Sequence, residues 1–424
     1  MPTRQPLVIV GASYAGVQLA ASARELGFEE RIVLIGDEPH APYQRPPLSK
    51  GLLTGKTTVD KLLLRGPDFF AQNRIELLLG RRATAVDAGA RKVMLDDGAT
   101  LDYGWLGLMT GARCRPLDLP GATLGKVFNL RTLDDALQVD AAAVDGRRAC
   151  IIGGGFIGLE VASALLARGL HVTVVEAQPH LLTRSFPPAM SAYIENAHRR
   201  RGVELLTGRG VRALHGAQGE VNAVELADGH RIDCDLVVLG IGVLPNVELA
   251  AAAGLATQGG IVVDRVGRSS APRVLSVGDV AHMALPPTPG GPTHMRLESI
   301  QAANDGARAA ATVLVGTEPP APVVPWFWSD QFDLKLQMAG LPVAGDEVVV
   351  RGDMTTDRFS VFYLRHGTLV ASHSVNRPSE HMQSRKLIAA QAQLTAQQLA
   401  DDGFDLKTVP IAVAAALPGG AQPG

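Results

Sequence analysis

Three glycines and a glutamate in the middle of the chain have the types and spacing needed to bind a dinucleotide. Gly153, Gly155 and Gly158 follow the apolar run 149–152, and Glu176 lies at the end of the next apolar run. In such a loop the first glycine permits a tight turn, the second lets the backbone approach a pyrophosphate, and the third lets helix pack on strand. The phosphate lies at the helix N-terminus, and the carboxylate accepts hydrogen bonds from a ribose. We therefore expect a nucleotide site here, with a purely structural strand–turn–helix as the alternative.

The residues around the glutamate indicate which nucleotide is bound. An acidic side chain at position 176 repels a 2′-phosphate, and the next residues, Ala177 and Gln178, supply no cation to hold one. The sequence therefore favours NADH over NADPH.

A second loop of this type lies near the start of the chain. Gly11 and Gly16 follow the buried-type run 7–10, but Ser13 stands where the middle glycine is expected. Serine needs more room than glycine, yet it still presents its backbone N–H. Asp37, after the next apolar run, supplies the ribose-binding carboxylate. Two nucleotides in one chain suggest FAD at this loop and NADH at the later one, and Asp279 in Ser-Val-Gly-Asp suits a flavin ribityl chain.

The repeat of strand, glycine loop, helix and strand defines the fold class that we expect. It is α/β, with two Rossmann-like dinucleotide-binding domains followed by a C-terminal α+β domain. Residues 1–114 and 245–321 form a discontinuous FAD-binding domain, 115–244 the NADH-binding domain, and 322–424 the C-terminal domain, with a disordered tail after Leu417. The helix after the second loop is expected from Leu159 to about Arg168.

Composition limits the possible partners. The chain has 424 residues, with 40 basic and 42 acidic side chains and a formal net charge of −2, so no global attraction to nucleic acid or an anionic membrane is expected. No apolar run approaches the roughly 20 residues of a transmembrane helix. We expect a cytoplasmic protein with no bound metal.

Six motifs carry a resemblance to a known family over nearly the whole chain. They are Tyr43–Lys50 (YQRPPLSK), Leu130–Thr132 (LRT), Ile151–Glu160 (IIGGGFIGLE), Gly240–Asn246 (GIGVLPN), Arg296–Ser299 (RLES) and Pro325–Gln331 (PWFWSDQ). In these motifs the chain resembles the ferredoxin reductases of bacterial oxygenase systems, of the putidaredoxin reductase and aromatic-ring dioxygenase reductase type. That family has the glutathione-reductase-type fold.

The resemblance implies roles for individual residues. Lys50 would lie at the reactive edge of the flavin and pair with Glu160, and Trp328 would pack close to the flavin. The implied FAD contacts are Gly11, Ser13, Ala15, Gly16, Asp37, Arg45, Lys50, Ala83, Thr110, Gly111, Arg131, Asp279, Glu298, Ile300 and Trp328. The implied NADH contacts are Gly153, Gly155, Phe156, Ile157, Gly158, Glu160, Glu176, Arg184 and Gly242. For single residues, ordinary alternatives stand beside these roles: a surface lysine, a glutamate at a helix start and a core tryptophan.

The expected electron acceptor follows from an absent thiol. Relatives that reduce disulfides need paired cysteines near the flavin, whereas this chain has Pro46-Pro47-Leu48-Ser49 in that region, and its cysteines, Cys114, Cys150 and Cys234, are widely separated. We therefore expect hydride transfer from NADH and single-electron transfer to a [2Fe-2S] ferredoxin that serves a Rieske dioxygenase or a cytochrome P450. A basic docking patch is expected from Arg65, Arg296, Arg308 and Lys335.

Two other functions remain open on the sequence. One is an NADH-flavoprotein that reduces a small molecule, such as monodehydroascorbate, oxygen or a quinone. The other is an NADH-sensing interaction protein of the apoptosis-inducing-factor type. The resemblance also implies a monomer or a weak homodimer.

Overall fold

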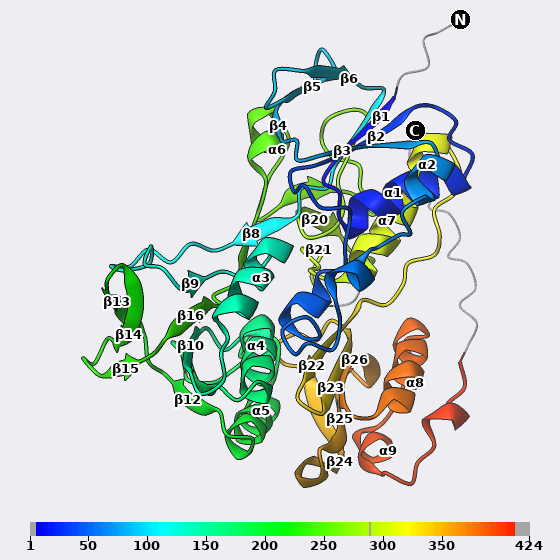
Figure 1. Ribbon diagram of the computed structural model, residues 1–424. Coiled ribbons are helices and arrows are strands. Elements are labelled where there is room, and N and C mark those ends of the chain that lie inside the picture. Colours follow the sequence, from blue (N-terminus) through cyan, green and yellow to red (C-terminus); the bar gives the residue numbers. More distant parts are fainter. Residues whose placement is uncertain (1–5, 288–289, 412–424) are drawn as a thin grey trace, which may run out of the picture. The chain divides into compact units, whose positions relative to one another are not determined.

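The computed structural model describes residues 6–287 and 290–411, which divide into two compact units (Figure 1). Unit 1 extends to Pro286 and includes the return segment Thr293–Pro320, whereas unit 2 contains Pro287–Pro292 and the chain from Ala321 onward. The tail for which disorder is expected, after Leu417, lies outside the described residues.

The first parallel sheet of unit 1 forms where the chain has continuous apolar runs. Its strand order is β19-β7-β1-β2-β3, and all of its pairs are parallel. All four residues of β1 are buried, because its two faces pack into separate cores: Leu7 and Ile9 into one, Val8 and Val10 into the other. The strands are β1 (Leu7–Val10), β2 (Ile32–Gly36), β3 (Ile75–Leu79), β7 (Trp105–Leu108) and β19 (Val274–Leu275).

Two helices distant in sequence cover one face of this sheet. Helices α1 (Tyr14–Glu25) and α7 (Ile300–Val315) lie side by side and share one apolar core (Figure 1). The return of the chain after residue 293 therefore completes the module that begins at β1.

The second parallel sheet repeats the arrangement, with strand order β12-β11-β10-β16-β9. Helix α4 starts at Phe156, three residues before the predicted start at Leu159, because Gly155 is its N-cap and the helix begins directly after the phosphate-type turn. The elements are β9 (Val127–Phe128), α3 (Leu133–Ala142), β10 (Arg148–Ile152), α4 (Phe156–Ala167), β11 (His171–Glu176), α5 (Pro188–Arg200), β12 (Glu204–Thr207) and β16 (Leu236–Leu239).

Unit 1 also contains smaller sheets, one of which connects the two modules. Strand β8 (Ala112–Cys114) pairs antiparallel with β17 (Val243–Pro245), so the two chain segments that run between the modules are hydrogen-bonded to each other. Two three-stranded antiparallel sheets were not predicted, because their strands mix buried apolar with exposed polar residues instead of forming continuous apolar runs. One consists of β4 (Ala83–Asp87), β5 (Lys92–Leu95) and β6 (Thr100–Asp102), and the other of β13 (Val211–Ala217), β14 (Glu220–Leu226) and β15 (Arg231–Asp233). The remaining elements of unit 1 are η1 (Pro46–Ser49), η2 (Val59–Leu62), α2 (Phe69–Gln72), α6 (Glu248–Ala252), β18 (Ile261–Val263), β20 (Ala281–Ala284) and β21 (His294–Met295).

Unit 2 is a five-stranded antiparallel sheet with helices beside it. The strand order is β22-β23-β26-β25-β24. Its elements are β22 (Trp326–Gln331), β23 (Leu334–Gly340), β24 (Glu347–Asp353), η3 (Met354–Thr356), β25 (Arg358–Arg365), β26 (Thr368–Val375), α8 (Pro378–Ala389), α9 (Ala396–Ala400) and η4 (Leu406–Thr408).

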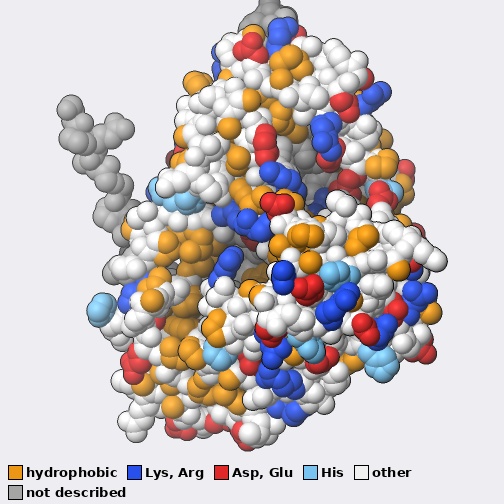
Figure 2. Space-filling view, turned by 90° about the vertical axis from the view of Figure 1, so that its left-hand side faces the viewer, with side chains coloured by type: hydrophobic (Ala, Val, Ile, Leu, Met, Phe, Trp, Pro, Cys, Tyr) orange, Lys and Arg blue, Asp and Glu red, His pale blue; other side chains and the backbone are white. Residues whose placement is uncertain are grey.

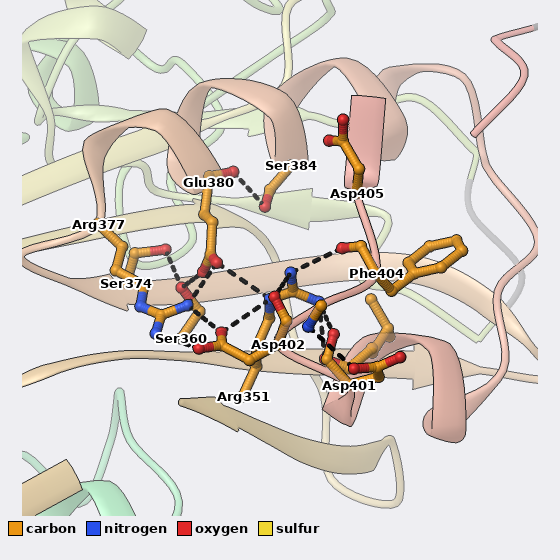
Figure 3. A network of polar contacts seen from close by, with 12 residues as sticks. Arg351, Ser360, Ser374, Arg377, Glu380, Ser384, Asp401, Asp402, Phe404 and Asp405 are labelled. Atoms are coloured by element: carbon orange, nitrogen blue, oxygen red, sulfur yellow. Dashed lines mark hydrogen bonds and ion pairs between the residues drawn. The ribbon is translucent and has the colours of Figure 1, made fainter. Parts of the chain in front are cut away.

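A buried arginine holds the end of unit 2 in place. The guanidinium of Arg351, 5% exposed, pairs with Glu380 at 3.0 Å and donates to the backbone carbonyls of Asp401, Asp402 and Phe404 (Figure 3). Arg377 bridges Glu380 and Asp402. These bonds pin the segment after α9 to β24 and α8.

The expected fold class, two Rossmann-like domains followed by a C-terminal α+β domain, is confirmed. Among the described residues, no helix has the length and apolar character needed to cross a membrane.

Candidate functional site

The loop after β1 brings backbone atoms too close together for larger residues. Gly11 has φ +117°, and a Cβ built on it would lie 2.1 Å from the Met109 carbonyl oxygen; one built on Gly16 would lie 2.0 Å from the Gly11 carbonyl oxygen. Ser13, which replaces the expected middle glycine, is the N-cap of α1, and no side-chain capping bond is formed there within the described residues. The backbone N–H groups of the first turn are thus left to meet an anion.

The predicted ribose-binding carboxylate lies at the end of β2. The Asp37 side chain is 61% exposed, and its contact with the guanidinium of Arg82 is long, at 3.5 Å. Its oxygens therefore keep capacity for ribose hydroxyls. Ala83 follows Arg82 and is buried at the start of β4.

Five further predicted residues converge near the other end of this site. Arg131 donates from Nη2 to Asp279 at 2.8 Å, and a Cβ on Gly111, which has φ +63°, would lie 3.6 Å from the same Nη2. Arg45 donates to the backbone carbonyl oxygen of Arg131 at 2.6 Å. The Thr110 hydroxyl donates to the Asn246 carbonyl at 2.7 Å and so holds the adjacent turn.

Two residues that were not predicted hold this cluster. Glu38 accepts from Arg45 at 2.6 Å and also from the hydroxyl of Tyr43. The same hydroxyl accepts from the backbone N–H of Leu133, the first residue of α3. Burial is the main cause that raises the pKa of Tyr43, so this side chain is a neutral link between the loop after β2 and α3. Tyr43 lies within a motif quoted above, but its long-range partner is visible only in the fold.

The start of α7 closes the cluster. Ile300 is the first residue of the helix, and the N-cap Ser299 accepts from the Ala302 N–H at 3.1 Å. Burial raises the pKa of Glu298, against the opposing effect of its ion-pair partner Arg296. Arg296 also donates to the Asp279 backbone, at 3.4 Å.

The later glycine loop meets the geometric requirements of a dinucleotide turn. Cβ atoms added to Gly153 and Gly158 would lie 2.4 Å from the Gly240 carbonyl oxygen and 2.1 Å from the Gly153 carbonyl oxygen, respectively. At Gly155 the nearest described heavy atom would be 3.9 Å away. The first and third glycines are therefore required by the protein itself, whereas the second leaves open space in front of the N-terminus of α4, where a pyrophosphate fits.

Glu176 is held next to this loop by two backbone groups. Its carboxylate accepts from the N–H of Gly154 and from the N–H of Gln178, each at 2.7 Å. The remaining lone pairs are available to ribose hydroxyls. Two further residues predicted to contact NADH lie in the same module. They are Gly242, which has φ +94°, and Arg184, which is exposed. Ile157 is 46% exposed at the start of α4, and the ring of its neighbour Phe156 packs edge-on against Phe186.

The two modules meet at an ion pair. Lys50 Nζ lies 2.7 Å from Glu160 Oε2, and the two side chains are 20% and 2% exposed. Lys50 follows the turn η1 of the first module and Glu160 lies in the first turns of α4 in the second, so the predicted pairing is present. The Ser49 hydroxyl donates to the same carboxylate oxygen at 2.6 Å, a contact that was not predicted.

The cysteines do not provide a thiol relay. Cys150 and Cys234 are buried, and burial raises the pKa of both thiols, that of Cys234 to about 12. Cys114 is only partly buried, and burial raises the pKa of its thiol too.

Of the remaining predicted residues, two lie in unit 2 and two in unit 1. Trp328 lies on β22 of unit 2, 5.5 Å from the ring of Trp326, and Lys335 is exposed on β23. Arg308 pairs with Asp305 on α7, and Arg65 lies over the ring of Phe69 in unit 1.

Two dinucleotide-type loops joined by a lysine–glutamate pair define the class of an FAD- and NAD(H)-dependent oxidoreductase. Comparison with known proteins agrees with this class. The family model described as pyridine nucleotide-disulphide oxidoreductase matches residues 5–307, and the model described as reductase C-terminal matches 326–410.

Individual relatives are similar over almost their full length. Rhodocoxin reductase of Rhodococcus erythropolis is 43% identical over 95% of this chain and 93% of its own. The anthranilate 1,2-dioxygenase system ferredoxin–NAD(+) reductase component of Burkholderia cepacia is 41% identical over 95% and 98%. The crystal structure of the covalent putidaredoxin reductase–putidaredoxin complex matches with a TM-score of 0.92 and 39% identity, over 95% of this chain and 97% of that one.

The chain belongs to the pyridine nucleotide-disulphide oxidoreductase family, within the group of putidaredoxin reductase-type ferredoxin reductases. The resemblance stated from the sequence is thereby confirmed. Members of this group contain FAD and use NAD(H), and the residues described above fit both cofactors.

Proposed function

We propose that this protein takes hydride from NADH and passes electrons singly to a [2Fe-2S] ferredoxin that serves an oxygenase. The observation that carries the proposal is the Lys50–Glu160 pair, which joins the two nucleotide modules within one compact unit. Relatives named as ferredoxin reductases support the choice of acceptor. The chemistry that bound FAD supplies is acceptance of a hydride and release of the two electrons one at a time.

The residues of the first module bind and orient FAD in this proposal. The N-terminus of α1 receives the pyrophosphate, Asp37 receives a ribose, and Arg131 and Asp279 reach the ribityl–phosphate part. Residues 1–114 and 245–321 form this FAD-binding domain, and residues 115–244 form the NADH-binding domain. In the second module Gly155 and Glu176 bind NADH, with Arg184 and Gly242 beside them.

Lys50 supplies positive charge at the junction of the two sites. Its ammonium stabilises negative charge that develops on a neighbouring ring, and Glu160 keeps the ammonium oriented in a site with little water. Trp328 belongs to the proposed C-terminal domain, residues 322–424, and the family resemblance implies a flavin contact for it.

The ferredoxin would dock through local positive charge. Figure 2 shows basic and acidic side chains intermingled over the face that it presents, which agrees with the net charge of −2. Arg65, Arg308 and Lys335 are the candidate docking cations. Arg296, the fourth predicted member, is only 22% exposed and contacts Glu298 and the Asp279 backbone, whereas Arg308 is 51% exposed, so we assign Arg296 to the flavin cluster instead. We also propose a cytoplasmic location and a monomer or weak homodimer.

Turnover with and without a [2Fe-2S] ferredoxin tests this function. A ferredoxin reductase shows NADH-dependent cytochrome c reduction that rises steeply when the carrier is added. Equal rates with and without the carrier would favour a small-molecule reductase, and a change of oligomeric state with little turnover would favour an NADH-sensing protein. The purified protein must also carry flavin; a colourless protein that does not take up FAD contradicts the proposal.

A further inference from the structure

One oxygen of the Glu160 carboxylate accepts from two donors on adjacent residues. The Ser49 hydroxyl reaches Oε2 at 2.6 Å and the Lys50 ammonium reaches it at 2.7 Å. Ser49 is 3% exposed and Glu160 is 2% exposed. The carboxylate is therefore removed from water, and each donor carries part of the stabilisation that water would otherwise provide.

The turn that delivers these donors is conformationally restricted. Pro46 and Pro47 open η1, and proline fixes φ near the helical value. The backbone N–H of Lys50 donates to the Pro47 carbonyl at 3.1 Å. Ser49 and Lys50 thus approach Glu160 as one rigid piece of chain from a position 111 residues away.

We propose that Ser49 is a positioning residue that fixes the direction of the Glu160 carboxylate, and through it the place of the Lys50 ammonium. This inference rests on the proposed function. The Ser49 hydroxyl and the Lys50 ammonium share one carboxylate oxygen, so loss of the hydroxyl leaves that buried oxygen with one donor fewer and lets the carboxylate turn. A carboxylate that turns no longer holds the ammonium in its place.

The test uses Ser49→Ala in the FAD-loaded protein, with Ser49→Thr as the variant that keeps the hydroxyl. Crystal structures of both variants report the contact between Lys50 Nζ and Glu160 Oε2, which is 2.7 Å in the unsubstituted chain. We expect this contact to be lost in Ser49→Ala and kept in Ser49→Thr.

A kinetic measurement separates positioning from general stabilisation. Stopped-flow reduction of the bound flavin by NADH, without ferredoxin, should slow about three- to tenfold in Ser49→Ala near pH 7. Ser49→Thr, which keeps the hydroxyl, should keep the wild-type rate. In a Glu160→Gln background the same serine substitution should add no further change, because the residue acts through Glu160. Ser384→Ala removes a buried hydroxyl from α8 in unit 2 and serves as the matched control.

The outcomes are distinct. An unchanged Lys50–Glu160 contact in Ser49→Ala, or effects that add fully to those of Glu160→Gln, would overturn the role of Ser49. If the wild-type protein holds flavin but NADH does not reduce it, the proposed function itself fails, whatever the serine variants show.

Discussion

Arg131 and Asp279 form an ion pair, 2.8 Å between Nη2 and Oδ2, that connects the segment leading into α3 with the loop after β19. The two residues are 148 positions apart in the chain. Arg45 donates to the backbone carbonyl oxygen of Arg131 and so holds that segment in place. The pair therefore brings a charge from the second nucleotide module to the candidate FAD site in the first.

Replacing this arginine should release FAD without unfolding the protein. In Arg131→Leu, Asp279 loses its cation and the site loses a bidentate donor, so we expect FAD affinity to fall about ten- to a hundredfold. Arg131→Lys should recover only part of the loss, because an ammonium does not reproduce the planar fork. Flavin absorbance after gel filtration measures the effect. Arg148→Leu, which breaks a surface pair with Asp233, is the control, and equal flavin loss in both variants would contradict the assignment.

Lys50→Met should slow hydride transfer while flavin remains bound. Glu160 is then a buried carboxylate without its cation, and no ammonium remains to stabilise developing negative charge. We expect flavin reduction by NADH to fall about ten- to a thousandfold. Stopped-flow absorbance at the flavin band measures the rate. Lys56→Met, an exposed lysine six residues further on, should leave the rate unchanged; an unimpaired Lys50→Met would exclude a role for this ammonium in catalysis.

Gly155→Ala and Gly158→Ala should separate binding from folding. A methyl group at position 155 meets no described atom closer than 3.9 Å, whereas one at 158 would lie 2.1 Å from a carbonyl oxygen. We expect Gly155→Ala to keep its Tm within about 2 °C and to weaken NADH binding at least tenfold, because the methyl occupies the pyrophosphate space. Gly158→Ala should lower Tm by several degrees, an overpacking cost of about 1–3 kcal/mol. Calorimetry and NADH titration of both variants check the two effects, and similar Tm values would show that the close approach at 158 relaxes freely.

The glycine loops and the Lys50–Glu160 pair could be predicted from the sequence for different reasons. The spacing of Gly153, Gly155 and Gly158 is local, so a short stretch of chain specifies the turn. The ion pair could be predicted only from the family resemblance, because neither sequence segment indicates which distant residue its side chain contacts. Tyr43 and Ser49 escaped prediction because each acts through a partner about 90 or more positions away. The expected start of α4 is three residues late because the third glycine of the motif, Gly158, lies inside the first turn of the helix and not in the loop.

Glu176→Ala should weaken NADH binding and reduce the preference over NADPH. The wild-type carboxylate is oriented by the N–H groups of Gly154 and Gln178, and its charge repels a 2′-phosphate. We expect KM for NADH to rise about tenfold with a smaller change in kcat, and the NADH-to-NADPH ratio of kcat/KM to fall by a similar factor. Steady-state ferricyanide reduction with both nucleotides measures the ratio. Glu176→Gln, which keeps an acceptor but not the charge, should lose selectivity with a smaller rise in KM, and unchanged selectivity in both variants would refute the assignment of this carboxylate.

His381 should make unit 2 less stable in acid. The side chain is 1% exposed against Trp326, no hydrogen-bond partner of either ring nitrogen is found among the described residues, and burial followed by the charge of Arg385 lowers its pKa to about 4. A lowered histidine pKa means that the unfolded chain binds more protons, so stability is full above about pH 6.5 and is lost progressively as pH falls toward 4. We expect a loss of about 1–2 kcal/mol between pH 7 and pH 5 from this residue.

Replacement by an apolar residue isolates the contribution of His381 to this acid sensitivity. In His381→Leu the difference in unfolding free energy between pH 7 and pH 5 should shrink by about 1–2 kcal/mol, because the proton that the unfolded histidine takes up is removed. Denaturant titration followed by tryptophan fluorescence in a Trp105→Phe background, in which Trp326 and Trp328 are the remaining tryptophans, measures unit 2. The buried His373, whose pKa burial lowers to about 3, remains in the variant, so some acid sensitivity should persist. An identical pH dependence in wild type and His381→Leu would mean that the histidine is solvated or hydrogen-bonded in solution.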